Sequence, residues 1–375
     1  MPPLNMLIKP ASGSCNLRCA YCFYYDEMEN REQASYGRMT PETQELLVRR
    51  AFEYAEGSVM FSFQGGEPTL MGLPFYRRLL ELQLRYNTRH IVVQNTIQTN
   101  GTLINGEWAA FLAENNFLVG LSLDGPREVQ NKMRTDAKGK GTFDRVMQTV
   151  SLFEQYGVEY NILMVVNHYV ARNIEKVYRF FKQHKIRFLQ PSPCLDPIGV
   201  TPGSLPYSLT VEDYTYFLKT LFDLWYADFV KGDLMIIRTF DNYIGILMGY
   251  SPEICSMLGN CICQFVTEAN GDVYPCDFYV LDEWRMGNIR ESSFAELREG
   301  AVAKRFLSSS YKLPAECFGC EWFNLCKGGC RRNREPFAGD VPSDNQFCGA
   351  YKAFFAHAAP RMKQIAAFLV HKAAR

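Results

Sequence analysis

The sequence has no excess of charge of either sign and no long apolar run free of charges. Lysine plus arginine and aspartate plus glutamate each number 40, so the formal net charge is zero. A strongly basic field, which attracts nucleic acid, is therefore missing, and we expect no nucleic-acid partner. No stretch of about 18 apolar residues is uncharged, and we expect no membrane span.

The chain also lacks an export signal at its start and is poor in histidine. Met1-Pro2-Pro3-Leu4 has neither a basic start nor an apolar core. The five histidines are scattered, and we interpret all of them as surface or satisfied core residues. Thirteen cysteines without an export signal favour metal or redox chemistry in the reducing cytoplasm over a disulfide scaffold.

The cysteines are distributed unevenly along the chain. Three lie at positions 15–22, one at 194, and nine between 255 and 348. This shift in composition is the strongest domain signal in the sequence. It predicts a first domain over residues 1–235 and a cysteine-rich domain over 236–375, which ends in an amphipathic helix.

The first three cysteines, Cys15, Cys19 and Cys22, have the spacing Cys-x3-Cys-x2-Cys. A four-iron cluster has four metal corners, and the next cysteine, Cys194, is far along the chain. Three thiolates therefore leave one iron open, as a reactive metal site requires. A zinc knuckle is the alternative, but zinc sites favour a Cys-x2-Cys pair with a further ligand close by.

Between residues 7 and 190, apolar strand patterns alternate with helical ones. This alternation predicts about six parallel βα units, which suits an α/β fold built as a partial (β/α)6 barrel. Active sites of such barrels lie at the carboxyl ends of the strands, and polar residues follow five consecutive strands. The expected strands are 7–9, 59–63, 91–98, 117–123, 160–166 and 187–190, and the expected helices are 40–56, 74–86, 107–114, 143–156, 173–184 and 210–229.

The cysteine-rich end contains a second ordered pattern. It reads Cys-x9-Gly-x4-Cys from Cys261, then Cys-x2-Cys-x5-Cys-x3-Cys from Cys317, then Cys348. With Cys255 there are eight cysteines, enough to ligate two complete [4Fe–4S] clusters. Two zinc sites remain the alternative, because Cys-x2-Cys suits either metal.

At the N-terminal loop, with Phe23 and Tyr24 after it and the Gly-Gly-Glu-Pro turn at 65–68, the sequence resembles the radical S-adenosylmethionine (SAM) enzymes. The resemblance implies a [4Fe–4S] cluster on the three cysteines, with SAM at the open iron. One electron would then split SAM into methionine and a 5′-deoxyadenosyl radical. The SAM contacts implied are Gly65, Gly66 and Glu67 for its amino group, Ser122 and Arg134 for its carboxylate, and Tyr21 and the Leu195 backbone near adenine.

The cysteine-rich end resembles the SPASM domain, an extension of radical SAM enzymes that modify peptides and proteins. This resemblance implies two auxiliary [4Fe–4S] clusters, three in all with the N-terminal one. Cys194 and Cys263 are left over, and we expect them to be packed thiols. The implied ligands are Cys255, Cys261, Cys276 and Cys330 for one auxiliary cluster and Cys317, Cys320, Cys326 and Cys348 for the other.

Several motifs together resemble the anaerobic sulfatase-maturating enzymes, and the likeness runs from the first residue to the last cysteine. It implies oxidation of a cysteine or serine to Cα-formylglycine within a Cys/Ser-x-Pro/Ala-x-Arg segment of a sulfatase, with Asp277 as the base. An electron donor such as ferredoxin or flavodoxin is implied as a second partner. The motifs are Lys9-Pro10, Cys22-Phe23-Tyr24, Gln64 to Pro68, Gln98 to Gly101, Cys276 to Tyr279 and Cys326 to Arg332.

Two other functions remain alternatives. A radical SAM enzyme that crosslinks a small peptide has both cysteine patterns, although most such enzymes carry a leader-binding domain, which we do not expect before Leu4. A non-catalytic iron–sulfur carrier or zinc scaffold is the other alternative. Such a protein has no need of the Gly65–Glu67 turn or of an open iron.

Overall fold

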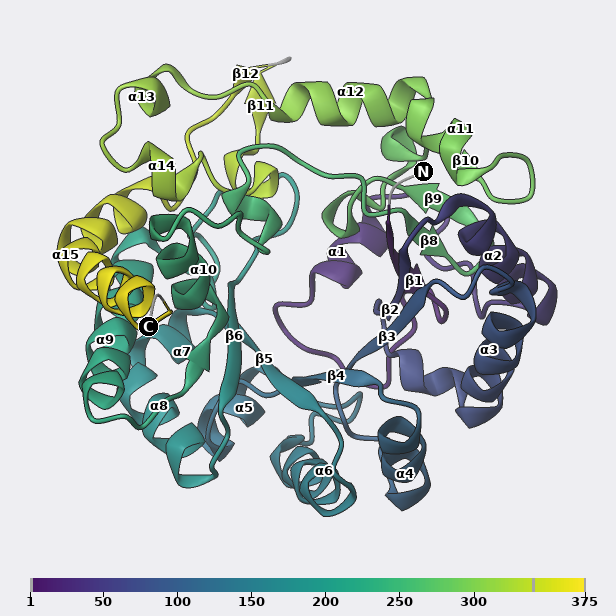
Figure 1. Ribbon diagram of the computed structural model, residues 1–375, viewed down its shortest axis with the longest axis horizontal. Coiled ribbons are helices and arrows are strands. Elements are labelled where there is room, and N and C mark those ends of the chain that lie inside the picture. Colours follow the sequence, from purple (N-terminus) through teal and green to yellow (C-terminus); the bar gives the residue numbers. More distant parts are fainter. Residues whose placement is uncertain (1–2, 339–340, 374–375) are drawn as a thin grey trace. The chain divides into compact units, whose positions relative to one another are not determined.

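The computed structural model describes residues 3–338 and 341–373, which form two compact units (Figure 1). The first unit comprises Met1–Leu123, Asn131–Asn161 and Ile262–Phe306, and the second comprises Asp124–Gln130, Ile162–Cys261 and Leu307–Arg375. These units do not follow the expected division after residue 235, which stays a prediction. The division falls within three elements, α5 (Arg127–Met133), β5 (Tyr160–Val166) and α12 (Ala301–Ser310).

The first unit contains a mostly parallel sheet in the order β10-β9-β8-β1-β2-β3-β4. The strands β1 to β4 pair in parallel with their neighbours, as short βα units require. The α/β prediction is confirmed. The strands are β1 (Leu4–Lys9), β2 (Ser58–Phe63), β3 (Val92–Thr99), β4 (Leu118–Ser122), β8 (Val266–Glu268), β9 (Asp272–Tyr274) and β10 (Gly287–Asn288).

Helices of the first unit begin where the sequence supplies caps. Thr40 caps α2 by accepting a hydrogen bond from the Thr43 amide, and Pro41 occupies the first helical position. The short helices α1 and α5 were not predicted, because seven residues show too little periodicity. The helices are α1 (Phe23–Glu29), α2 (Pro41–Tyr54), α3 (Leu73–Tyr86), α4 (Gly106–Glu114), α6 (Phe143–Tyr156) and α11 (Phe294–Glu299).

A segment from the C-terminal third of the chain extends the sheet at its first strand. Strand β8 lies parallel to β1, with Ile8 opposite Thr267 and Lys9 opposite Glu268. Strands β8 and β9 have only three residues each, so their period-2 pattern is too short to be recognised in the sequence. This pairing brings Asp277, just beyond β9, into the same unit as the N-terminal cysteine loop.

The second unit packs helices around short parallel strands. Phe222, Trp225 and Phe240 pack with Phe354 of the last helix to form an aromatic core. Its elements besides β5 are α7 (His168–Arg172), α8 (Ile174–Gln183), β6 (Phe188–Pro193), α9 (Val211–Val230), β7 (Ile236–Ile237), α10 (Arg238–Leu247), α13 (Ala315–Phe318), α14 (Phe323–Cys326), β11 (Phe337–Ala338), β12 (Val341–Pro342) and α15 (Cys348–Ala373).

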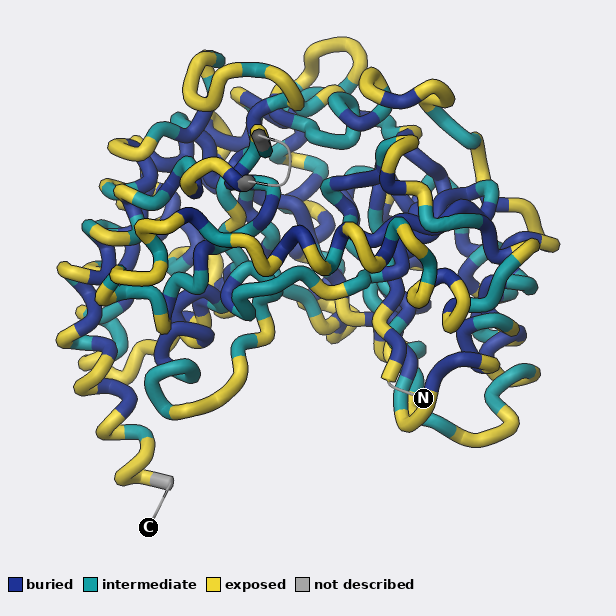
Figure 2. The backbone as a smooth tube through the Cα atoms, turned by 90° about the horizontal axis from the view of Figure 1, so that it is seen from above, coloured by how far each residue is buried: buried dark blue, intermediate teal, exposed yellow. Residues whose placement is uncertain are grey.

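Burial along α15 changes from one end to the other. Figure 2 shows buried and exposed residues alternating along this helix and exposed ones towards its C-terminal end. The helix therefore belongs to the core at its start, as its apolar spacing predicts. Among the described residues, no helix combines the length and apolar character needed to cross a bilayer.

Candidate active site

The cysteine loop between β1 and α1 is held by backbone hydrogen bonds from both sides. The Arg18 amide donates to the Thr135 carbonyl at 2.7 Å, and the Ala20 amide donates to the Met133 carbonyl at 3.0 Å. The Cys15 sulfur accepts from the Leu17 amide at 3.3 Å. The loop is therefore shaped by the protein itself, which is what preorganised metal ligands require.

The three thiols are half-buried, and the surroundings of Cys15 and Cys22 disfavour bare thiolates. Burial raises the pKa of Cys15 to about 11, with the nearby Glu67 carboxylate adding to the effect. Burial also raises the pKa of Cys22, although the Tyr24 and Tyr25 amides and the Arg134 charge oppose this. Thiolates in such a place need a metal centre to replace their protons, so the donor set fits a resident cluster.

The Gly-Gly-Glu-Pro turn after β2 packs directly against the cysteine loop. The Glu67 amide donates to the Ser14 carbonyl at 2.8 Å. Gly66 has a φ of +51°, and a Cβ atom there would lie 2.2 Å from the Ser14 oxygen. Glycine is therefore required for a close approach between two backbones.

We expect Gly66→Ala to displace the cysteine loop and to empty its cluster. Iron bound after anaerobic reconstitution should fall from about twelve to about eight per chain. Gly57→Ala is the matched control, because Gly57 also has a positive φ of +76° but no atom lies within 4 Å of its Cβ position. If both variants retained the same iron, the close approach at Gly66 would not matter for the loop.

The Glu67 carboxylate is buried, and both of its oxygens accept hydrogen bonds from the protein. One oxygen accepts from the Thr69 hydroxyl at 2.6 Å and the Thr99 hydroxyl at 2.7 Å, and the other accepts from the Asn100 amide at 2.8 Å. Burial raises its pKa, and these donors partly offset the rise. Glu67 thus ties the ends of β2 and β3 together beneath the loop.

The other residues expected at SAM come from different parts of the fold, with Tyr21 in the cysteine loop and Arg134 directly after α5. Ser122 ends β4 and is buried, and the Arg134 guanidinium lies 5.4 Å from the centre of the Tyr21 ring. Ser122, Arg134 and Tyr21 belong to the first unit, like the cysteine loop, and Leu195 belongs to the second unit, after β6. The SAM contacts of these residues stay predictions.

Asp277 is buried, and only one of its oxygens has a partner. Its Oδ2 accepts from the Tyr24 hydroxyl and from the Gln64 side-chain amide, both at 2.8 Å. Its Oδ1 has no hydrogen-bond partner among the described residues. Buried acceptors are normally paired, so a buried Oδ1 without a partner, beside a fixed Oδ2, is a candidate acceptor for a donor from outside the chain.

A cluster of buried charges lies behind Asp277, and the sequence analysis did not identify it. Lys9 lies 3.0 Å from Glu27 and 3.4 Å from Glu268, and Arg31 lies 2.8 Å from Glu268. With Asp277 the cluster holds three carboxyl groups and two cations. The sequence offered one signal for this cluster. Lys9 is a charged residue at the end of β1, an apolar strand whose neighbouring residues are mostly buried, and a lysine in such a place needs carboxylate partners.

Burial and charge have opposite effects on the carboxyl groups of this cluster. Burial raises the pKa of Glu27 to about 7, although Lys9 lowers it. Burial also raises the pKa of Asp277, again partly offset by Lys9. For Glu268 the burial effect is outweighed by Lys9 and Arg31, so its pKa is lowered. Lys9 therefore lowers the pKa of all three carboxyl groups in the cluster.

We expect Lys9→Met to destabilise the protein by about 3–5 kcal/mol, because it leaves buried carboxylates without their counter-ion. Urea unfolding of metal-free protein at pH 7 would measure the loss. The double variant Lys9→Met/Glu27→Gln should recover part of it, since the uncompensated charge at Glu27 is gone. A loss below about 1 kcal/mol would mean that the cluster does not depend on Lys9.

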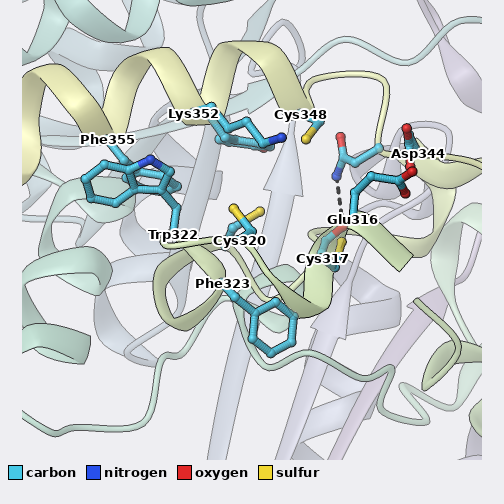
Figure 3. A pocket seen from close by; sticks show the side chains of 13 residues that line it. Glu316, Cys317, Cys320, Trp322, Phe323, Asp344, Cys348, Lys352 and Phe355 are labelled. Carbon is cyan, nitrogen blue, oxygen red and sulfur yellow. Dashed lines mark hydrogen bonds between the residues drawn. The ribbon is translucent and has the colours of Figure 1, made fainter. Parts of the chain in front are cut away.

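Four cysteines of the C-terminal pattern line one cavity of about 70 Å³ in the second unit. They are Cys317, Cys320, Cys326 and Cys348, the set expected to share one auxiliary cluster. Figure 3 shows Cys348 on α15 facing the loop that carries Cys320, with Lys352, Trp322 and Phe355 beside them. Four thiols around one cavity fit a resident cluster, whose ligation by these residues stays a prediction.

Three of the four cysteines expected at the other auxiliary cluster belong to the second unit. Burial raises the pKa of Cys255 to about 11 and that of Cys261 to about 12, and the negative charge of Cys330 adds to both shifts. Cys276 belongs to the first unit, directly before Asp277, and its place in this ligand set stays a prediction. The described residues contain no group of three or more His, Cys, Asp or Glu side chains that fits a single metal ion.

The two remaining cysteines differ in their surroundings. Cys194 is buried, and its sulfur lies 3.7 Å from the Leu195 carbonyl. Cys263 is half-buried, with its sulfur 3.9 Å from the Met286 sulfur. Both are packed against neighbours, as expected of thiols outside the cluster patterns.

Comparison with known proteins finds two family models. Residues 10–181 match the model described as the radical SAM superfamily, and residues 260–321 match the model described as an iron–sulfur cluster-binding domain. The two matches cover the N-terminal cysteine loop and part of the C-terminal pattern. The predicted cofactor classes are therefore confirmed, as SAM and iron–sulfur clusters.

Curated relatives extend over almost the whole chain. A cysteine-type anaerobic sulfatase-maturating enzyme of Clostridium novyi is 50% identical over 99% of this chain and 100% of its own length. A serine-type anaerobic sulfatase-maturating enzyme of Bacteroides thetaiotaomicron is 35% identical over 96% of this chain and 90% of its own length.

Among solved structures, one described as native anSMEcpe with bound AdoMet and Cp18Cys peptide has the same fold. It matches this chain with a TM-score of 0.94 at 49% identity, over 98% of this chain and 100% of that chain. That structure holds both a SAM molecule and a peptide.

Proposed function

This chain belongs to the anaerobic sulfatase-maturating enzymes of the radical SAM superfamily, and we propose from that premise that its target residue is a cysteine and its base Asp277. The enzyme oxidises one residue of a sulfatase polypeptide to Cα-formylglycine. It uses SAM and three [4Fe–4S] clusters for this reaction.

Sequence identity to the curated relatives supports cysteine as the target residue. The relatives at 50% identity are cysteine-type enzymes, whereas a serine-type relative is 35% identical. A thiol also loses its proton more readily than a hydroxyl, so a buried carboxylate is a sufficient base for it. We propose a Cys-x-Pro/Ala-x-Arg segment as the preferred substrate.

The proposal includes the cofactor-binding roles that the family resemblance implies. Cys15, Cys19 and Cys22 would hold the cluster, and the Gly65–Gly66 backbone would approach the amino group of SAM. Arg134 and Ser122 would bind its carboxylate. Once bound, the cluster and SAM supply a 5′-deoxyadenosyl radical that takes a hydrogen atom from the β-carbon of the target.

We assign to Asp277 the removal of the proton from the target thiol. Tyr24 and Gln64 donate to Oδ2, which fixes the carboxylate plane and leaves the lone pairs of Oδ1 for the substrate. Gln64 also donates to the Tyr24 hydroxyl at 2.7 Å, so the two donors hold each other. The unpartnered Oδ1, in the same unit as the cysteine loop, is the observation that carries this proposal.

The proposal also covers the path of the electrons and the cellular compartment of the enzyme. The auxiliary clusters would take up the second electron of the oxidation, and a ferredoxin or flavodoxin would reduce the N-terminal cluster. None of the thirteen cysteines forms a disulfide in the structure, a state that a reducing cytoplasm maintains. We therefore assign the enzyme to the cytoplasm.

Two peptides that differ only in the target residue test this function. With dithionite and SAM, a Cys-x-Pro-x-Arg peptide should lose about 18 mass units and gain an aldehyde, whereas its serine analogue, which would lose about 2, should react more slowly. A crosslinking enzyme would remove about 2 mass units from the cysteine peptide and leave no aldehyde. That result would show that the function is peptide crosslinking and not sulfatase maturation.

A further inference from the structure

A hairpin pairs with the exposed side of the N-terminal cysteine loop. Residues 133–136 run antiparallel to 17–20, with a bridge between Leu17 and Asp136, and a second bridge joins Thr135 to Gly141. Lys138 and Lys140 lie in the turn that this second bridge closes. The exposed part of the hairpin is its turn, residues 137–140, whereas Met133 and Arg134 are buried.

Basic side chains are concentrated at this place although the whole chain is neutral. Residues 132–145 contain five basic and two acidic side chains, and Arg18 is the one charged residue among residues 15–22. Arg18, Lys138 and Lys140 are exposed. We call these three residues the basic edge.

The basic edge is not neutralised by nearby carboxylates. In the described part of the chain, no carboxylate lies within ion-pair distance of Arg18, Lys138 or Lys140. Asp136 accepts from the backbone amides of Lys138 and Lys140, each at 3.0 Å, and pairs with Arg145 at 3.2 Å. The Asp136 carboxylate therefore interacts with the turn backbone and Arg145 and does not pair with the ammonium groups of Lys138 and Lys140.

Other arginines of the first unit do pair with carboxylates. Arg77 pairs with Glu107 at 2.9 Å, and Arg78 and Arg85 share Glu45 at 2.8 and 3.2 Å. Arg18, Lys138 and Lys140 have no such partner among the described residues, and they lie together beside the cysteine loop.

We propose that the basic edge is the docking surface for a small acidic one-electron carrier of the flavin or iron–sulfur class, which reduces the Cys15/Cys19/Cys22 cluster. This proposal rests on the proposed function, which requires a reduced cluster. Transient redox complexes bury little surface, so a few charges determine their encounter rate. Arg18 donates to the Cys15 carbonyl at 3.0 Å, so a carrier that contacts Arg18 lies close to a cluster ligand.

The electron balance of the step is simple. The carrier is oxidised by one electron, and the cluster is reduced by one electron, with no proton or further reactant. An RNA partner would also be attracted to a basic surface, but the absence of net positive charge in the chain disfavours it.

Charge reversal tests the proposal with purified flavodoxin as the probe. In the reconstituted enzyme, Lys138→Glu/Lys140→Glu should weaken flavodoxin binding at least about 10-fold at low salt, and the difference should shrink in high salt. Flavodoxin-supported formation of 5′-deoxyadenosine should fall to a similar extent. With dithionite as the reductant, the variant and the wild type should be equal.

The control reverses two exposed lysines of the second unit, Lys363→Glu/Lys372→Glu, and should bind flavodoxin like the wild type. Equal losses with both reductants would overturn the proposal, because the lysines would then support the loop itself. Unchanged flavodoxin affinity, or an RNA oligomer bound tightly only through these lysines, would overturn it as well. If the wild type failed with dithionite, the proposed function would fail, while the binding comparison would still judge the docking surface.

Discussion

Asp277→Asn is expected to stop formylglycine formation while SAM cleavage continues. The amide keeps the size of the carboxylate and can still accept at one oxygen, but it cannot take the proton of the target thiol. Loss of a general base typically costs about 10²–10⁴-fold in rate. The measurement is the ratio of aldehyde product to 5′-deoxyadenosine, which should fall by that factor.

Two further variants make this prediction specific. Tyr24→Phe removes one donor to Oδ2 and should slow aldehyde formation less than Asp277→Asn does, by roughly 10-fold. Asp282→Asn changes an exposed aspartate five residues away and should leave the ratio unchanged. An Asp277→Asn enzyme that produced aldehyde at the normal rate would move the base to another residue.

Cys15→Ala is expected to abolish SAM cleavage and to remove about four of about twelve irons per chain. Two remaining thiolates do not hold a cubane, whereas the cysteines of the C-terminal pattern are untouched. Iron and sulfide content of anaerobically reconstituted protein measures the first effect, and 5′-deoxyadenosine measures the second. Cys263→Ala is the matched control and should retain all of the iron, since Cys263 packs against Met286 outside both patterns.

The iron content also distinguishes clusters from zinc. If Cys15→Ala kept its full iron content, the N-terminal loop would not be a cluster site. If the wild type contained zinc in place of iron there, the radical chemistry would be excluded. Loss of about eight or more irons would instead show that the variant disturbs the whole chain.

Much of the first unit was predictable, because its elements carry local signals. Helix α6 and strand β5 match the predicted ranges residue for residue, since each has a clear period and a defined boundary. The pairing of β8 with β1 was not predictable, because it joins three residues to a strand more than 250 positions earlier. No local pattern encodes such a contact.

The candidate site shows the same limit. The cysteine spacing and the Gly-Gly-Glu-Pro turn identified the chemistry, but the glutamate was expected to accept from an ammonium. In the structure its carboxylate accepts from Thr69, Thr99 and Asn100. Gln64 and Tyr24 were noticed as a strand-end residue and an aromatic neighbour of the loop. Their shared contact with Asp277 depends on the fold that brings them together.

A labelled peptide tests most directly that radical and base act on one substrate residue in this site. The target cysteine carries deuterium at both β-hydrogens, and the enzyme is given SAM and dithionite. We expect one deuterium in each 5′-deoxyadenosine formed, together with an aldehyde peptide that retains the other. Aldehyde formed alongside unlabelled 5′-deoxyadenosine would contradict the account, because the hydrogen would then have left the β-carbon by another route.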